Sequence, residues 1–361
     1  MTAALRERTR HTDGTIAMHN LDARIATSVA PALDVLSESS EGGTTRQEVD
    51  RVASLTDLLV LRGHLVGSIA DYERATAVTT RLVSRQLESG PAHLAHARTM
   101  AALHRFDEAI EATAHAEVLG APPRELHLER ASIMQAVGHY DVAERLLDGV
   151  SQSSEDPTLI GSLAVLRAEQ GHVSLAESLF DRAIQTLRGT SPFPLAQLVF
   201  RRGLMWMRVN EAGPARDWFS EATRLLPAYA PAVGHLAELD LAEGRPADAV
   251  EKLHSVARTS DDPEYAACLS EALSAAGDED AAAAWRERAV ARYEELEARH
   301  PEAFVDHAAA FWLGPGRDPI RGRALSLRAL VTNHTDRSRD RALRALSFAG
   351  SAWPTPGASV V

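Results

Sequence analysis

The chain has 361 residues, of which 45% are hydrophobic but only 5% aromatic, so alanine and leucine supply most of its apolar surface. Its formal net charge is -12, which argues against nucleic acid or an anionic membrane as the main partner. The single cysteine, Cys268, excludes an intrachain disulfide. Because no run of about 18 apolar residues and no signal-peptide core occurs, we expect a cytoplasmic protein without a membrane-spanning segment.

Residues 1–46 fall outside the repeat that follows them. Residues 21–36 have apolar side chains at helical spacing, and Pro31 would begin or kink a helix there. Residues 37–45, SESSEGGTT, have the composition of a flexible linker. Two alternatives remain open for the part before this linker: an N-terminal capping helix or a disordered arm.

Residues 47–296 repeat one unit. In residues 131–143, ASIMQAVGHYDVA, and 164–176, AVLRAEQGHVSLA, an apolar helical run ends at a glycine turn, and an alanine follows five residues later. This turn position recurs at intervals of 34, 34, 33, 39, 34 and 33 residues, at Ala70, His104, Gly138, Gly171, Asn210, Gly244 and Gly277. The insertion RGTSPFP at 188–194 explains the interval of 39. Periods of about 20–50 residues are typical of stacked helical or strand units.

The unit resembles the tetratricopeptide repeat (TPR). The two helices, the period of 34, the glycine turn, an aromatic residue soon after it (Tyr72, Phe106, Tyr140) and small residues in the second helix carry this resemblance. The tryptophan position of the first helix is never tryptophan in this chain. The resemblance implies an all-α fold: a right-handed superhelical solenoid of about seven TPR-like helix-turn-helix repeats with helical caps.

Residues 297–349 are predicted to form C-terminal capping helices or an irregular eighth repeat, and residues 350–361 a mobile tail. Residues 295–313 read as one helix that ends at Gly314-Pro315-Gly316 and resembles a closing segment of bacterial repeat proteins. From Arg317 to Arg344 the chain has eight arginines and three aspartates, a local charge of +5. Such a basic patch suits an acidic partner or RNA, although solvated arginines are the commoner explanation.

No arrangement of residues in the sequence predicts catalysis. The chain has no G-x-S-x-G, G-x-x-x-x-G-K-[ST] or G-x-G-x-x-G motif, so we expect neither an enzyme nor a bound cofactor. His93 and His96 lie three residues apart, and His127 occupies the equivalent repeat position. Because no carboxylate or cysteine stands at a complementary spacing, we assign no metal site to them.

The resemblance also implies where a ligand binds. In TPR proteins the first helix of each repeat lines a concave groove that holds extended or helical peptides. Carried onto this chain, that role falls on His64, Arg98, Ser132, Gln135, Phe200, Leu204, Met207, Arg208, Glu238, Glu264 and Glu271.

This groove would be apolar in its middle and acidic at its C-terminal end. It would suit a protein or peptide ligand with apolar anchors followed by basic residues. For Phe200 and Met207, packing beneath the 39-residue repeat is the alternative.

We therefore predict a non-catalytic scaffold or adaptor. The alternatives are a regulatory subunit that acts on a partner enzyme or transcription factor, and a metal- or small-molecule-binding protein that uses the histidines. Nucleic acid is not expected as a ligand, and the sequence does not indicate the partner, the pathway or the oligomeric state.

Overall fold

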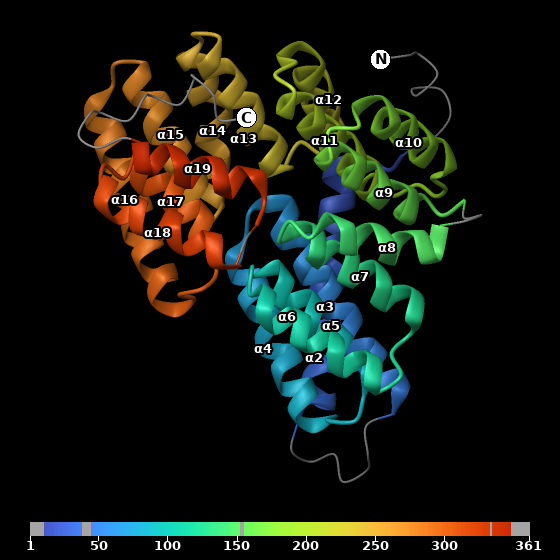
Figure 1. Cartoon of the computed structure of the whole chain (residues 1–361). Helices are drawn as coiled ribbons and strands as arrows, with labels where there is room; N and C mark the ends of the chain where they lie inside the picture. The colour runs from blue at the N-terminus through green and yellow to red at the C-terminus, as the bar shows by residue number, and fades with distance from the viewer. Residues whose placement is uncertain (1–10, 38–44, 152–154, 333, 348–361) are drawn as a thin grey trace.

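The computed structural model describes residues 11–37, 45–151, 155–332 and 334–347, and within these ranges every regular element is an α-helix (Figure 1). Seven successive helix pairs occupy the positions of the seven predicted repeats. They are α3 (Arg46–Val66) with α4 (Ile69–Arg85), α5 (Gly90–Ala102) with α6 (Phe106–Val118), α7 (Pro123–Ala136) with α8 (Tyr140–Ser151), α9 (Pro157–Glu169) with α10 (Val173–Thr186), α11 (Phe193–Arg208) with α12 (Ala212–Leu225), α13 (Ala230–Ala242) with α14 (Pro246–Thr259), and α15 (Pro263–Ala275) with α16 (Glu279–Arg299).

The predicted turn positions explain how each pair is connected. Six of the seven adopt the left-handed backbone conformation that ends a helix, including the non-glycine residues His104 (φ 59°) and Asn210 (φ 61°). The assignment of Ala70 is wrong, because Ala70 lies inside α4. In that pair Gly67 takes the left-handed conformation (φ 65°). The Ser68 side chain accepts a hydrogen bond from the Asp71 amide and caps α4, so this helix begins at Ile69, before the predicted turn position.

The alanine five residues after each turn position packs the pair together. All seven of these alanines are completely buried: Ala75, Ala109, Ala143, Ala176, Ala215, Ala249 and Ala282. A methyl group at this point lets the second helix approach the first closely, which explains how a chain poor in aromatic residues packs its helix pairs without voids.

One of the predicted C-terminal helices is interrupted. Residues 295–313 do not form one helix, because α16 ends at Arg299 and α17 (Val305–Leu313) begins only after Pro301 and the left-handed Phe304 (φ 55°). Pro301 cannot donate a helical hydrogen bond, so the chain turns there. Helix α17 packs on α18 (Pro319–Thr332), and α19 (Asp336–Ser347) follows.

At the N-terminus, residues 14–35 form helix α2 (Gly14–Val35), whose Leu21 and Ile25 are buried and which packs on α3. The predicted flexible linker falls mostly on residues 38–44 and the predicted mobile tail on residues 350–361, which lie outside the described residues. In the part of the chain that is described, no helix is both long and apolar enough to cross a membrane.

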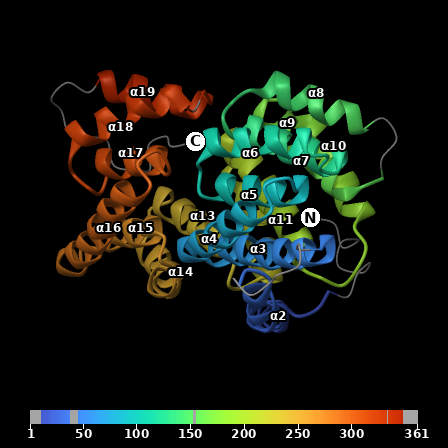
Figure 2. The same cartoon turned by 90° about the horizontal axis from the view of Figure 1, so that it is seen from below.

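The row of repeats curves until its two ends meet (Figures 1 and 2). Beside the turn between α3 and α4, the Ser260 hydroxyl donates a hydrogen bond to the Gly67 carbonyl at 2.5 Å. The His104 ring at the next turn lies 5.3 Å from the Phe304 ring. At the third turn, the His334 amide donates to the Val137 carbonyl at 2.9 Å. The first three repeats therefore rest on the last part of the chain.

Candidate functional site

The inner wall is defined here as the surface formed by the first helices of the repeats, α3, α5, α7, α9, α11, α13 and α15. It carries the residues predicted to bind a ligand. The structure divides them among an N-terminal group around Arg98, a central group around Phe200 and a C-terminal group of glutamates, so they do not form one continuous site.

In the N-terminal group, Arg98 stands among three carboxylates. Its guanidinium nitrogens lie 3.6 Å from Asp57, 3.5 Å from Glu125 and 3.5 Å from Glu129. Burial raises the pKa of Asp57 and of Glu129, although the charge of Arg98 opposes that shift. The guanidinium of Arg98 is therefore shared by three carboxylates, so carboxylates outnumber cations in this group.

A cavity of about 280 Å³ lies beside Arg98. Its lining comes from the first helices of three successive repeats and includes Asp50, Leu94 and Glu125. It combines an apolar side with charged groups of both signs, which is the usual character of a binding surface. Ser132 is exposed and Gln135 is half-buried on the neighbouring helix α7.

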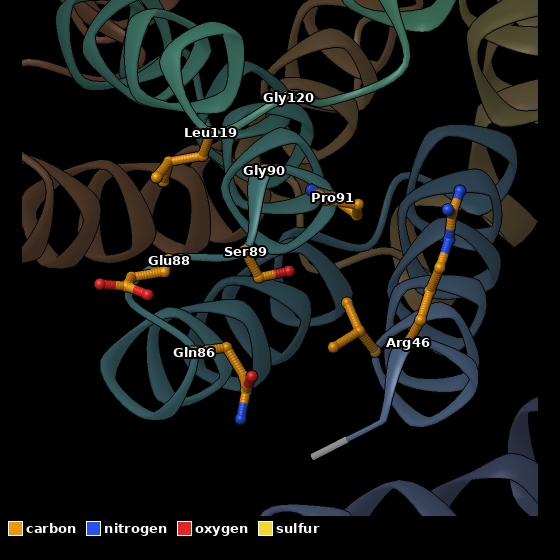
Figure 3. A pocket seen from close by; sticks show the side chains of 9 residues that line it. Arg46, Gln86, Glu88, Ser89, Gly90, Pro91, Leu119 and Gly120 are labelled. Atoms are coloured by element: carbon orange, nitrogen blue, oxygen red, sulfur yellow. The ribbon is translucent and has the colours of Figure 1, made fainter. Parts of the chain in front are cut away.

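A second cavity, of about 290 Å³, opens between the start of α3 and the turn that precedes α5 (Figure 3). Arg46 and Pro91 line both cavities, so the two are neighbours. Gly90 allows α5 to begin close to the next turn, because a Cβ atom on Gly90 would lie 2.5 Å from the Ala121 amide nitrogen. The sequence did not indicate this cavity, because its walls come from turns of adjacent repeats.

The central group belongs to the core. Phe200 is only 4% exposed, and its ring lies 5.1 Å from Tyr229 and 5.7 Å from Phe219. The His64 Nε2 atom is 3.0 Å from the Tyr229 hydroxyl, and burial lowers the pKa of His64 to about 4. The packing alternative therefore holds for Phe200, and His64 joins α3 to the helices of the fifth and sixth repeats.

The remaining central residues lie at the edge of this core. Leu204 and Met207 are half-buried against it. Arg208 is exposed and donates a hydrogen bond to Glu169 at 2.6 Å. Of the predicted apolar patch, only Leu204 and Met207 keep surface that a ligand could reach.

The C-terminal group consists of Glu238, Glu264 and Glu271. Glu238 lies 3.0 Å from His235 Nδ1, and Glu264 lies 3.4 Å from His307 Nδ1. Glu271 has no ion-pair partner within the described residues, and burial together with the charge of Glu238 raises the pKa of Glu271 to about 8. This part of the wall therefore holds more carboxylates than its own cations balance.

Glu264 is an exposed member of this group. Its side chain keeps 51% of its surface open to water, and its carboxylate lies beside His307. Burial would raise the pKa of Glu264, but the hydrogen bond and charge of His307 lower it. The same hydrogen bond raises the pKa of His307 against the effect of its own burial, so both partners favour the charged pair.

Other reactive side chains of the wall are occupied or deactivated. Burial and nearby carboxylates raise the pKa of the Cys268 thiol well above its usual value, so it is a poor nucleophile. The His93 Nε2 atom lies 3.1 Å from the Leu87 carbonyl, and the His96 Nδ1 atom lies 3.0 Å from the Thr79 hydroxyl. Among the described residues, no three His, Cys, Asp or Glu side chains stand close enough to hold a metal ion.

No family model matches the sequence, and no curated protein matches it. Several solved structures are similar to this chain. Human IFIT1, as a dimer with PPP-AAAA, is 16% identical over 84% of this chain and 73% of its own, with a TM-score of 0.54. Cut9, from the APC/C hetero-tetramer Cut9-Hcn1, is 17% identical over 74% of this chain, with a TM-score of 0.50. The match spans about half of Cut9, 46% of its length.

A tetratricopeptide repeat protein from Parabacteroides merdae is 12% identical over 67% of this chain and 93% of its own, with a TM-score of 0.47. Sequence identities as low as these indicate a similar fold and do not indicate a shared function. The paired helices, their recurring left-handed turns and the similarity to Cut9 and IFIT1 together show that the chain has a fold of the tetratricopeptide repeat type.

Proposed function

We propose that this protein is a non-catalytic scaffold of the cytoplasm that binds a protein or peptide ligand along its inner wall, and that the ligand contributes basic side chains. The observation that carries the proposal is Glu271, a half-buried side chain that feels the charge of Glu238 and has no ion-pair partner in the described residues. A ligand cation there would stabilise the charged form of Glu271 and would form a charge-assisted hydrogen bond.

The N-terminal end of the wall supports the same ligand charge. Asp57 and Glu129 keep raised pKa values, because burial outweighs the charge of Arg98. A basic side chain beside Asp57 and Glu129 would therefore gain from these carboxylates, while Arg46 and Arg98 line the adjoining cavity.

The apolar part of the ligand is a smaller contribution in this proposal. Since Phe200 is committed to the core, the ligand's apolar anchors would contact Leu204 and Met207.

The test is affinity capture with the full chain as bait, followed by identification of the bound proteins by mass spectrometry and by arrays of their peptides. The double variant Glu238→Gln/Glu271→Gln replaces two carboxyl groups of the inner wall with amides that cannot ionise. Glu111→Gln/Glu251→Gln removes two exposed charges from the second helices α6 and α14 and serves as the matched control.

We expect the inner-wall variant to lose the bound proteins while the control retains them, and we expect the captured peptides to be rich in arginine or lysine. Capture of the same proteins by the wild type and by the inner-wall variant would contradict the proposal. Circular dichroism of both variants establishes that any loss does not come from unfolding.

A further inference from the structure

Helix α18 leaves one whole face apolar and open. Its buried face repeats at helical spacing through Gly322, Leu325, Ser326 and Ala329. The opposite face, which we call the α18 stripe, consists of Ile320, Ala324, Leu327 and Val331, at i, i+4, i+7 and i+11. Within the stripe, Ile320 is 84% exposed, Leu327 41% and Val331 75%. This spacing aligns the four side chains along one side of the helix.

Exposed apolar side chains are concentrated at this end of the solenoid. Eleven large hydrophobic side chains are exposed in the described residues, and five of them lie on α18 or α19: three in the α18 stripe, and Leu343 and Leu346 on α19. A terminal repeat needs a polar outer face to remain soluble when nothing stacks on it. An apolar stripe at this place is instead what a packed helix requires on its covered side.

The charges beside the stripe indicate which partner fits it. Arg323 borders the stripe on one side and is exposed, and Arg328 borders it on the other, where it contacts Glu302. The surrounding segment, residues 317–344, has eight arginines and three aspartates. Arg321 and Arg341 already pair with carboxylates of neighbouring helices, so Arg323 is the arginine beside the stripe that a ligand's carboxylate would meet first. We propose that the α18 stripe docks an acidic amphipathic helix of a partner protein, with apolar residues covering the stripe and carboxylates facing the arginines.

Two other occupants fit the charges less well. A second copy of this chain, packed stripe against stripe, would place Arg323 and Arg328 against the same arginines of its partner, and like charges in such positions destabilise a helix pair. Residues 349–361 of the chain contain no acidic residue that could pair with the arginines. The surface is separate from the inner wall, so this inference is independent of the function proposed above.

The test uses a defined probe and the full chain. The probe is a synthetic helical peptide with leucines at i, i+4, i+7 and i+11 and glutamates at the flanking positions, and its counterpart carries lysines in place of the glutamates. Fluorescence anisotropy measures the binding of each peptide. We expect the glutamate peptide to bind at least about tenfold more tightly than the lysine peptide, with a difference that shrinks as salt is added.

Variants assign the binding to the stripe. Ile320→Ser/Val331→Ser should weaken binding of the glutamate peptide by about tenfold or more, because both changes remove apolar contact with the peptide. Arg323→Glu should reduce the preference for glutamate over lysine. Val118→Ser replaces an exposed valine on α6 and should change neither value. All three are surface changes, and equal thermal midpoints would establish that the variants are folded.

Several results would overturn the proposal. Equal affinity for the two peptides, or affinity that the serine pair leaves unchanged, would contradict it. A concentration-dependent dimer that the serine pair abolishes would identify a second copy as the occupant. Binding of the glutamate peptide only after deletion of residues 349–361 would identify the chain's own terminus. Binding to phosphatidylserine vesicles instead of the peptide, lost in the serine pair, would identify a membrane surface.

Discussion

The carboxylate of Asp261 caps helix α4 from 192 residues away in the sequence. Its Oδ1 atom accepts a hydrogen bond from the Ile69 amide at 2.7 Å, and its Oδ2 atom accepts one from the Ala70 amide at 3.0 Å. Arg292 donates to the same carboxylate at 3.0 Å and holds it in place. A residue of the loop before the seventh repeat thus satisfies the free amides that open the second helix of the first repeat. In an open solenoid each repeat contacts only its neighbours, so this contact adds cooperativity between distant repeats.

Replacing Asp261 tests that long-range contact. Asp261→Ala leaves two helix-end amides and Arg292 without their carboxylate, and we expect it to lower the free energy of unfolding by about 1–3 kcal/mol. Urea denaturation followed by circular dichroism measures the change. Asp217→Ala, which removes an exposed carboxylate from α12, is the control and should have almost no effect. Equal urea midpoints for Asp261→Ala and Asp217→Ala would show that the contact between Asp261 and helix α4 does not stabilise the protein.

Gly67 tests the close approach at the same contact. It has a positive φ of 65°, and a Cβ atom there would lie 2.5 Å from Tyr265 Cε2. Gly171 has a similar φ of 78° but no atom within 4 Å of its would-be Cβ. We expect Gly171→Ala to cost about 1–2 kcal/mol from backbone strain alone, and Gly67→Ala to cost about 1–3 kcal/mol more from overpacking. Thermal unfolding of the two variants gives the difference, and equal losses would mean that Tyr265 moves away freely.

Phe200→Ala distinguishes a core residue from a groove residue. Because Phe200 is buried among His64, Phe219 and Tyr229, we expect a loss of about 3–5 kcal/mol in the free energy of unfolding. Met207→Ala should cost less, because its side chain is only half-buried. Chemical denaturation of the two single variants measures both. If the Phe200→Ala protein kept its stability but no longer bound its ligand, Phe200 would be a ligand-binding residue and not a core residue.

Glu271 predicts how stability changes with pH. Its pKa is raised to about 8 in the folded protein, so the folded state binds a proton that the unfolded state releases near pH 4.5. The stability from this group is present below pH 4.5 and is lost as pH rises toward 8. Glu271→Gln keeps a neutral side chain and should flatten that decline, raising stability at pH 8 relative to wild type by about 1–2 kcal/mol, since water reaches part of the side chain. Unfolding curves at several pH values measure it, and parallel wild-type and variant profiles would contradict the prediction.

The repeat could be predicted from the sequence because its signals are local. A residue that ends a helix in the left-handed conformation and an alanine five residues later both act within one helix pair, and these positions recur clearly enough to locate seven pairs. The prediction was wrong where two local signals competed. The left-handed turn forms at Gly67, three residues before the expected position at Ala70. Pro301 and Phe304 interrupt residues 295–313, whose pattern predicts one helix.

The candidate site could be predicted only in part. The excess of acidic residues on α13 and α15 is visible in the sequence. Whether His64 and Phe200 faced a ligand or the core depended on how closely α3 approaches α11 and α13. The cavity beside Arg98 also depends on three repeats together.

By itself, the sequence determined that this protein is a row of stacked helix pairs, and it determined where nearly every pair turns, because those features depend on residues a few positions apart. Only the tertiary structure decided that the row closes on itself, with Asp261 at the start of α4 and Tyr229 against His64. The reason is that curvature adds up from a small rotation at every repeat interface, and no single repeat encodes the sum.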